Sequence, residues 1–213
     1  IYPTVFFSAT LSPYEYYRNV IVGKNCECTR HIEIASPFPS ENLEIMIDTS
    51  INTSYKYRKE TLPALAKRIC KELKDRHGNY MVFLPSFEYL DMVSVYVEKM
   101  LQDRSDLKIV KQRPGMTELE KNAYLSAFDS AYDGLLVGFA VLGGHFGEGI
   151  DLTGEKLSGV VIVGVGIPKI SPERQILSNY YSEKFGDGFA FAYRFPGWEK
   201  VLQAVGRVIR TDD

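Results

Sequence analysis

Several features that are scarce in this sequence limit its possible functions. Only three of its 213 residues are cysteines, which argues against a disulfide scaffold and fits a reducing, intracellular compartment. The longest apolar runs, such as residues 157–168, are too short to span a bilayer, and no signal peptide opens the chain. The formal net charge is −2, so no strong overall field attracts nucleic acid or an anionic membrane. Any site for a polyanion must therefore be a local patch.

Two motifs of nucleotide-hydrolysing enzymes are missing as well. No glycine-rich loop ends in Gly-Lys-Ser/Thr, and no acidic box of the Asp-Glu-x-His kind is present to hold magnesium. If this chain handles a nucleoside triphosphate, it supplies only part of the site. The sequence opens with Ile1 rather than methionine, directly before a strand-like stretch, and stops at Asp213 soon after a helical stretch. We expect a fragment of a longer protein.

The residues that are present alternate between strand and helix patterns. Hydrophobic residues make up 45% of the chain, enough for a substantial core. Short apolar runs predict strands, and apolar residues at helical spacing predict helices between them. The expected strands are 4–7, pieces of 32–50, 80–85, 107–112, 134–141 and 157–168, and the expected helices include 57–74, 86–103 and 116–131. This order predicts an α/β fold with a parallel sheet covered on both faces, whose ligands bind outside the carboxyl ends of the strands.

One of the loops expected at that edge is rich in glycine. It contains Gly143, Gly144, Gly147 and Gly149 and ends with Glu148 and Asp151. Glycines after a buried strand let backbone N–H groups approach a phosphate, and a nearby carboxylate can hold a ribose hydroxyl or a metal. The alternative is a merely flexible turn, in which His145 also has no catalytic role. A dinucleotide site at Gly164-x-Gly166 is disfavoured because Lys169 stands where the third glycine should be.

The eight residues 203–210, QAVGRVIR, place basic and polar groups in an apolar helical stretch. Gln203, Arg207 and Arg210 are four and seven residues apart and would share one helical face. Val201, Val205 and Val208 would lie towards the core. Gly206 costs a helix about 1 kcal/mol relative to alanine, which suggests that something approaches it closely. The alternative is an amphipathic helix with a solvated basic face.

Two further clusters have simpler alternatives. Cys26, Cys28 and His31 fall within six residues and hint at a metal, but a structural site normally needs four ligands and there is no second cluster, so isolated loop thiols are favoured. Residues 55–59 interleave aromatic and basic side chains, as proteins that bind single strands do. A solvated start of a helix is favoured for this stretch.

Taken together, these motifs resemble a family. The ordered set SATL (8–11), MVFLPS (81–86), GEGIDL (147–152) and QAVGRVIR (203–210) resembles motifs three to six of the superfamily 2 DNA helicases of the XPD/DinG type. Residues 192–210 are most similar to the bacterial DinG-like members. The resemblance implies a RecA-like second helicase lobe at 13–213, truncated at its C-terminal end, preceded at 1–12 by a strand and motif three of the first lobe.

The resemblance also implies roles for individual residues. Gln203, Arg207 and Arg210 match positions that face ATP, the arginines acting as catalytic fingers on the γ-phosphate. Gly149 and Asp151 match positions that line the nucleotide and couple it to DNA. The remaining matches are the coupling residues Ser8, Ala9 and Thr10 of motif three and the DNA-binding residue Ser86 of motif four, which as an alternative only caps its helix.

For the whole protein, the resemblance implies an ATP-dependent helicase that translocates 5′-to-3′ on single-stranded DNA, in the bacterial cytoplasm at the nucleoid. ATP and Mg²⁺ would be held mainly by the first lobe of the same polypeptide, and an iron–sulfur cluster could only lie elsewhere in the full-length protein. Two alternatives remain: a non-catalytic module that binds nucleic acid or protein, and a glycine-loop methyltransferase. The methyltransferase is disfavoured because no acidic residue follows the next strand at the required place.

Overall fold

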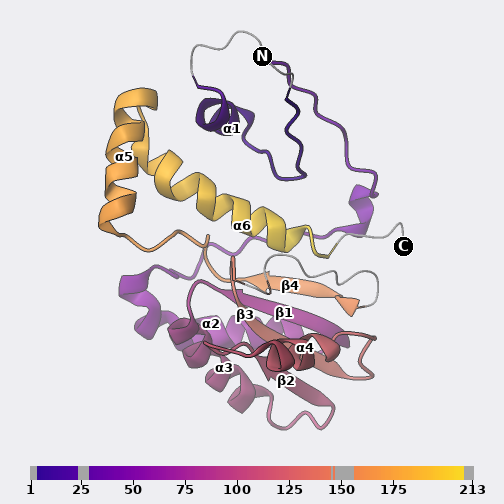
Figure 1. Ribbon diagram of the computed structural model, residues 1–213. Helices are drawn as coiled ribbons and strands as arrows, with labels where there is room; N and C mark the ends of the chain where they lie inside the picture. Colours follow the sequence, from indigo (N-terminus) through magenta and orange to yellow (C-terminus); the bar gives the residue numbers. More distant parts are fainter. Residues whose placement is uncertain (1–3, 24–28, 145, 147–155, 209–213) are drawn as a thin grey trace.

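The computed structural model describes residues 4–23, 29–144, 146 and 156–208 (Figure 1). Within this part of the chain, four strands form one parallel sheet in the order β2-β3-β1-β4. The strands are β1 (Gly78–Leu84), β2 (Leu107–Lys111), β3 (Leu135–Val141) and β4 (Gly159–Ile162). Each overlaps a stretch that the sequence predicts to be a strand, so the predicted parallel α/β class is confirmed.

The main helices are α1 (Tyr14–Ile21), α2 (Arg58–Leu73), α3 (Phe87–Leu101), α4 (Glu118–Ser126), α5 (Pro172–Phe185) and α6 (Phe195–Val205), with a π-helical turn at Ala190–Arg194 and 3₁₀ turns at Ser40–Asn42 and Tyr55–Tyr57. The predicted helices at 57–74, 86–103 and 116–131 are present as α2, α3 and α4, whereas α1 was not predicted. At the start of α4, Thr117 Oγ1 accepts a hydrogen bond from Glu120 N, and Thr117 N donates to Glu120 Oε2. This capping box begins α4 where the sequence predicts it, although the helix ends before 131.

Alternating residues of β1 separate two cores on opposite faces of the sheet. Val82 and Leu84 lie in a core with α2 and α3, whereas Met81 and Phe83 lie in a second core with α4 and Ala204 of α6. All four β1 side chains are at most 1% exposed. A strand buried on both faces has to be apolar throughout, which is the pattern of 80–85. Helices therefore cover both faces, as predicted.

The strand predictions near the beginning of the chain are wrong. Residues 4–7 have no strand hydrogen bonding, and Val5 and Phe7 are 82% and 90% exposed. Residues 32–50 contain a 3₁₀ turn at Ser40–Asn42 and otherwise no regular element. A β-branched, apolar composition makes a strand only where a neighbouring strand takes up the backbone hydrogen bonds, and no described residue does so here.

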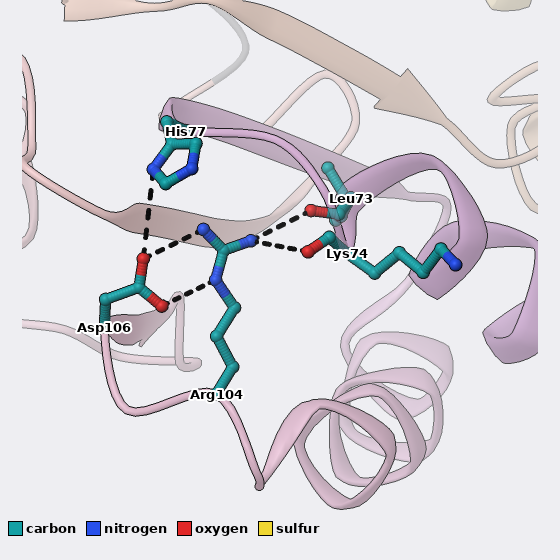
Figure 2. Close-up of polar contacts among 5 residues, drawn as sticks. All are labelled: Leu73, Lys74, His77, Arg104 and Asp106. Carbon is teal, nitrogen blue, oxygen red and sulfur yellow. Dashed lines mark hydrogen bonds and ion pairs between the residues drawn. The ribbon is translucent and has the colours of Figure 1, made fainter.

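A polar cluster holds the opposite, amino edge of the sheet together (Figure 2). Arg104, in the turn before β2, donates from Nε and Nη2 to both carboxylate oxygens of Asp106, over 2.7 and 2.9 Å. Its Nη1 donates to the carbonyls of Leu73 and Lys74, at the end of α2. His77 Nδ1 lies 3.9 Å from Asp106 Oδ2. One guanidinium thus caps α2 and ties it to the turn that precedes β2.

The exchange of Asp106 for asparagine should lower the melting temperature near neutral pH. The hydrogen bond from Arg104 lowers the pKa of the Asp106 carboxyl in the folded protein. A carboxyl with a depressed folded pKa stabilises the fold above its unfolded pKa of about 4 and loses that contribution as the pH falls through the folded value. Thermal melts should therefore show a gap between wild type and Asp106→Asn at about pH 7 that narrows towards about pH 3.

Asp103, exposed in the same turn, provides the matched control. Asp103→Asn removes an equal charge without disturbing the contacts of Arg104. If both variants had the same melting temperature at neutral pH, Asp106 would affect stability only through the net charge of the protein. Its hydrogen bonds with Arg104 would then have no stabilising role.

Candidate functional site at the carboxyl edge of the sheet

The chain segments that follow β3, β1 and β4 meet at the carboxyl ends of these three neighbouring strands. Leu142 N donates to Leu84 O over 2.8 Å, and Val163 N donates to Phe83 O over 2.9 Å. The chain segments that follow β3 and β4 therefore leave the sheet on either side of Pro85 and Ser86. The expected common edge is confirmed for the starts of the loops after β1 and β3, whereas the third loop expected there, at 8–13, follows no strand.

Glycines shape the turns after β3 and β4. Gly143, Gly164 and Gly166 have φ angles of +69°, +75° and +60°, a region that other residues enter only with strain. At Gly143 the chain turns back at once, and Gly144 N donates to Val141 O over 3.0 Å. Beyond this turn, the predicted residues Gly147, Glu148, Gly149 and Asp151, together with His145, lie outside the described residues.

Helix α6 crosses this edge in direct backbone contact with the turn after β4. Gly197 is buried in its first turn, and a Cβ there would lie 2.6 Å from Val165 O and 3.3 Å from Ile167 N. On its other side, Phe195 packs against Tyr16 of α1, with ring centroids 4.9 Å apart. Figure 1 shows α6 in yellow between α1 and the sheet. The missing side chain at Gly197 is thus what lets α6 lie against the turn.

The end of α6 differs from the sequence prediction. The helix stops at Val205, and Arg207 and Val208 donate three residues back, to Ala204 O and Val205 O, in a tighter turn. Gly206 is the C-cap of α6. The helix ends here because glycine favours the helical conformation less than any residue except proline. Gln203 and Arg207 therefore do not share one regular helical face, and Arg210 lies outside the described residues.

For residues 201–208, the prediction of which side chains face the core is partly confirmed. Val201 and Val208 pack against the second core, as expected. Gly206 is exposed, and a Cβ there would meet only carbonyl oxygens of α6 itself, so no described residue makes the predicted close approach. Arg207 is half-buried. Gln203 Oε1 is buried without a hydrogen-bond donor among the described residues.

Ser86 lies at the start of α3, and its capping role is directly visible. Its Oγ accepts from Tyr89 N over 3.3 Å, as an N-cap does. Arg58 Nη1 approaches the same oxygen at 3.5 Å, and its guanidinium lies over the rings of Tyr89 and Tyr55, at 4.7 and 5.5 Å from their centroids. Two separate sequence features, Ser86 and the aromatic–basic stretch 55–59, thus form one cluster, which the sequence alone did not reveal.

The motif-three residues lie outside regular elements, with a turn at Ala9 and Thr10. Thr10 N donates to Ser8 Oγ over 3.2 Å, and Ser8 and Ala9 are exposed. Their neighbour Pro13 and the α6 residues Phe195 and Trp198 line a mainly apolar pocket of about 290 Å³. The segment thus passes next to α6, the helix that carries Gln203.

The cysteines and histidine considered as metal ligands give no site among the described residues. Cys26 and Cys28 lie outside them, and the His31 ring stacks on Tyr14, with centroids 4.1 Å apart. Burial within α2 raises the pKa of the Cys70 thiol to about 11, so this cysteine acts as an inert core residue. In the described ranges, no group of three His, Cys, Asp or Glu side chains could hold a metal ion, and no helix is long and apolar enough to cross a membrane.

Known proteins share this sequence pattern and fold. A family model described as helicase C-terminal domain matches residues 67–213. A probable ATP-dependent helicase of Methanocaldococcus jannaschii is 27% identical over 192 residues, covering 84% of this chain and 28% of that protein. The ATP-dependent DNA helicase DinG of Photobacterium profundum is 24% identical over 215 residues, covering 98% and 30%. The ATP-dependent DNA helicase CHL1 of Debaryomyces hansenii is 27% identical over 158 residues, covering 68% and 19%.

Two solved structures share the fold. One, named XPD helicase, matches with a TM-score of 0.54 at 23% identity, over 74% of this chain and 27% of that chain. The other, Xpd4 of S. tokodaii, matches with a TM-score of 0.53 at 14% identity, over 77% and 30%. The chain thus spans less than a third of the length of each of these relatives. Because the family model covers more than half of it, the chain belongs to the helicase C-terminal domain family, of the XPD/DinG type.

Proposed function

We propose that this chain is the second RecA-like lobe of an ATP-dependent DNA helicase that couples ATP hydrolysis to translocation on single-stranded DNA and to duplex unwinding. The first lobe belongs to the same polypeptide and ends with the motif-three segment at 1–12. Translocation runs 5′-to-3′, and the protein works on bacterial chromosomal DNA in the cytoplasm, in repair or replication. The names of the relatives support the ATP and DNA parts of this proposal.

The observation that carries the proposal is that α6 crosses the carboxyl edge of the sheet, with Gly197 and Lys200 against the turns after β3 and β4. In parallel α/β sheets, ligands bind at this edge. The end of α6 presents Gln203, whose buried Oε1 lacks a donor among the described residues, and the half-buried Arg207. A buried acceptor without a donor costs about 1–3 kcal/mol, which an amino or hydroxyl group of a bound nucleotide would recover. These groups fit one side of a nucleotide site.

The other side of the site has to come from the first lobe. Phosphoryl transfer needs a cradle for the phosphates and carboxylates for Mg²⁺, and the described residues offer no carboxylate cluster of that kind. Arg207 and Arg210 supply the complementary part. A guanidinium stabilises the charge that spreads over the transferring phosphoryl oxygens, through planar, forked hydrogen bonds. ATP hydrolysis therefore depends on closure of the two lobes.

Single-stranded DNA binds along the cluster formed by Arg58, Ser86 and Tyr55. Arg58 brings a positive charge to the amino end of α3, where the helix dipole already favours an anion. Tyr55 is 76% exposed and offers a ring on which a base can stack. Contacts of this kind hold the backbone without reading the sequence of bases.

A comparison of this chain with the full polypeptide tests the proposal. We expect the chain alone to give no sustained phosphate release, because the phosphates lack their cradle and Mg²⁺ its ligands. The full polypeptide should hydrolyse ATP and be stimulated by single-stranded DNA. Steady DNA-stimulated turnover by the isolated chain would refute the division of the site. Absence of turnover in the full polypeptide would instead support a non-catalytic binding module.

A second test separates the capping role of Ser86 from its DNA role. Ser86→Glu places a carboxylate beside Arg58, where it can still cap α3 but cancels the positive charge and repels phosphate. We expect the full polypeptide with this change to lose roughly tenfold in affinity for single strands of every sequence, while basal ATPase is kept.

Ser171 provides the control, because it caps α5 in the same way: its Oγ accepts from Arg174 N over 3.3 Å. Ser171→Glu should leave binding of fluorescent oligonucleotides at low salt unchanged. Equal affinities for both variants would leave Ser86 as a cap without a role in DNA binding.

A further inference from the structure

Lys200, in the middle of α6, lies against both glycine turns of the carboxyl edge. A Cβ added to Gly143 would lie 2.5 Å from Lys200 Cδ and 2.7 Å from Cε. A Cβ added to Gly166 would lie 3.5 Å from the same Cδ and 2.7 Å from Leu142 Cδ2. The aliphatic stem of Lys200 therefore occupies the space that the two missing side chains leave.

The charge at the end of this stem has no partner in the described part of the chain. Lys200 is half-buried, and its ammonium makes no hydrogen bond or ion pair with any described residue. The adjacent carboxylate, Glu199, is instead hydrogen-bonded to the Tyr17 hydroxyl, which contributes to the raised pKa of Tyr17. Neighbouring positions on a helix do not face each other, so Glu199 does not neutralise Lys200.

A packed stem makes this ammonium well suited to bind an anion. A lysine on an open surface loses side-chain entropy when its ammonium is fixed by an anion. The contacts of the Lys200 stem with the turns at Gly143 and Gly166 have already restricted it, so less entropy is lost on binding. Burial of the stem with the charged end left accessible is how lysine combines apolar packing with a charge.

The position of Lys200 along α6 relates this charge to the nucleotide site. Lys200 precedes Gln203 by three residues, which puts the two side chains on the same side of the helix, about 4.5 Å apart along its axis. Gln203 Oε1 is the buried acceptor that lacks a donor. Lys200 and Gln203 thus lie on the same side of α6, and the Lys200 stem lies against the turns that follow β3 and β4.

We propose that Lys200 binds a phosphate group of the nucleotide, as a cation of this site additional to Arg207 and Arg210. This rests on the proposed function and adds a residue to that same site. Lys200 acts by binding, as a point charge present in ground and transition states alike. Its loss should therefore weaken nucleotide affinity and raise KM, with little change in kcat.

The test uses Lys200→Met in the full polypeptide, because methionine keeps the stem in its slot and removes only the charge. We expect the Kd of a slowly hydrolysed ATP analogue, and the KM for ATP, to rise about tenfold, the effect of one charge-assisted hydrogen bond. Lys200→Arg should restore both to within about twofold, since it retains the charge. The melting temperature of Lys200→Met should match that of the wild type.

The control is Lys184→Met, which removes a lysine from α5, where Lys184 lies near the ring of Tyr180. An analogue Kd for Lys200→Met equal to that of the wild type or of Lys184→Met would overturn the inference. So would a loss of single-stranded DNA affinity without loss of analogue affinity, because the phosphate bound by Lys200 would then belong to DNA. A wild-type polypeptide that neither binds the analogue nor hydrolyses ATP would refute the proposed function itself.

Discussion

Replacing Arg207 or Arg210 with alanine in the full polypeptide should lower kcat for ATP hydrolysis by roughly 10³–10⁵-fold. The KM for ATP should change far less. The reason is that a guanidinium on the transferring phosphoryl group binds the transition state more tightly than bound ATP, so its loss raises the barrier and affects the ground state little. Arg207 lies in the tight turn after α6, where its side chain is half-buried.

Lysine should be a poor replacement at both positions, because a single ammonium cannot form the planar pair of hydrogen bonds. Arg76→Ala is the matched control: Arg76 is exposed in the loop before β1, at the opposite edge of the sheet. Single-turnover rates and equilibrium binding of ATP, measured on the same variants, separate chemistry from affinity. Near-normal turnover in Arg207→Lys or Arg210→Lys would contradict the finger role of that residue.

The central fold was predictable because its signals are local and strong. The apolar runs at 80–85 and 134–141 can be buried only in a sheet covered on both faces, and the structure places both strands there, paired with each other. The capping box at Thr117 fixed the start of α4 in the same way. These patterns need no knowledge of distant parts of the chain.

The wrong predictions concern a strand that needs a neighbouring strand and a helix end at which two kinds of turn compete. Residues 4–7 have the composition of a strand but no neighbouring strand among the described residues. The last turn of α6 was predicted to continue as a helix because its periodicity continues past Gly206. Glycine lowers helix stability enough for a tighter turn to take over after Val205. The spacing of apolar residues alone does not show whether the α-helix or the tighter turn is more stable there.

The sequence predicted individual residues of the candidate site, which remain predictions, but not how they are arranged. Sequence reasoning identified Ser86 and Gln203, and the shared edge followed from the parallel sheet. It missed Lys200, and it did not connect Arg58, in the stretch 55–59, with Ser86, because these contacts cross 57 and 28 residues of chain, with Gly143 and Ser86. It also missed Gly197, whose role is visible only once the turn after β4 lies against it.

Gly197→Ala should destabilise the protein by about 2 kcal/mol, although alanine is the better helix former. Two effects of opposite sign compete at this position. In the interior of a helix, alanine is favoured over glycine by about 1 kcal/mol. Against this, the new Cβ would lie 2.6 Å from Val165 O and 3.3 Å from Ile167 N and Cα, which is overpacking against backbone. Backbone cannot turn aside as a flexible side chain can, and overpacking typically costs 1–3 kcal/mol or more. We therefore expect the clash to prevail.

The same exchange should also lower nucleotide affinity, because α6 is positioned by its contact with the turn after β4. If α6 moves away from the turn after β4 to admit the Cβ, it carries Lys200 and Gln203 with it, so nucleotide affinity should fall together with stability. Gly206→Ala is the stability control, because this exchange on the same chain segment meets only carbonyls of α6, the nearer at 3.3 Å, and Gly206 has an ordinary φ of −65°. Urea denaturation should show a lower midpoint for Gly197→Ala and little change for Gly206→Ala. A Gly197→Ala protein as stable as the wild type would mean that α6 and the turn separate at little cost, and that the glycine does not determine how closely they pack.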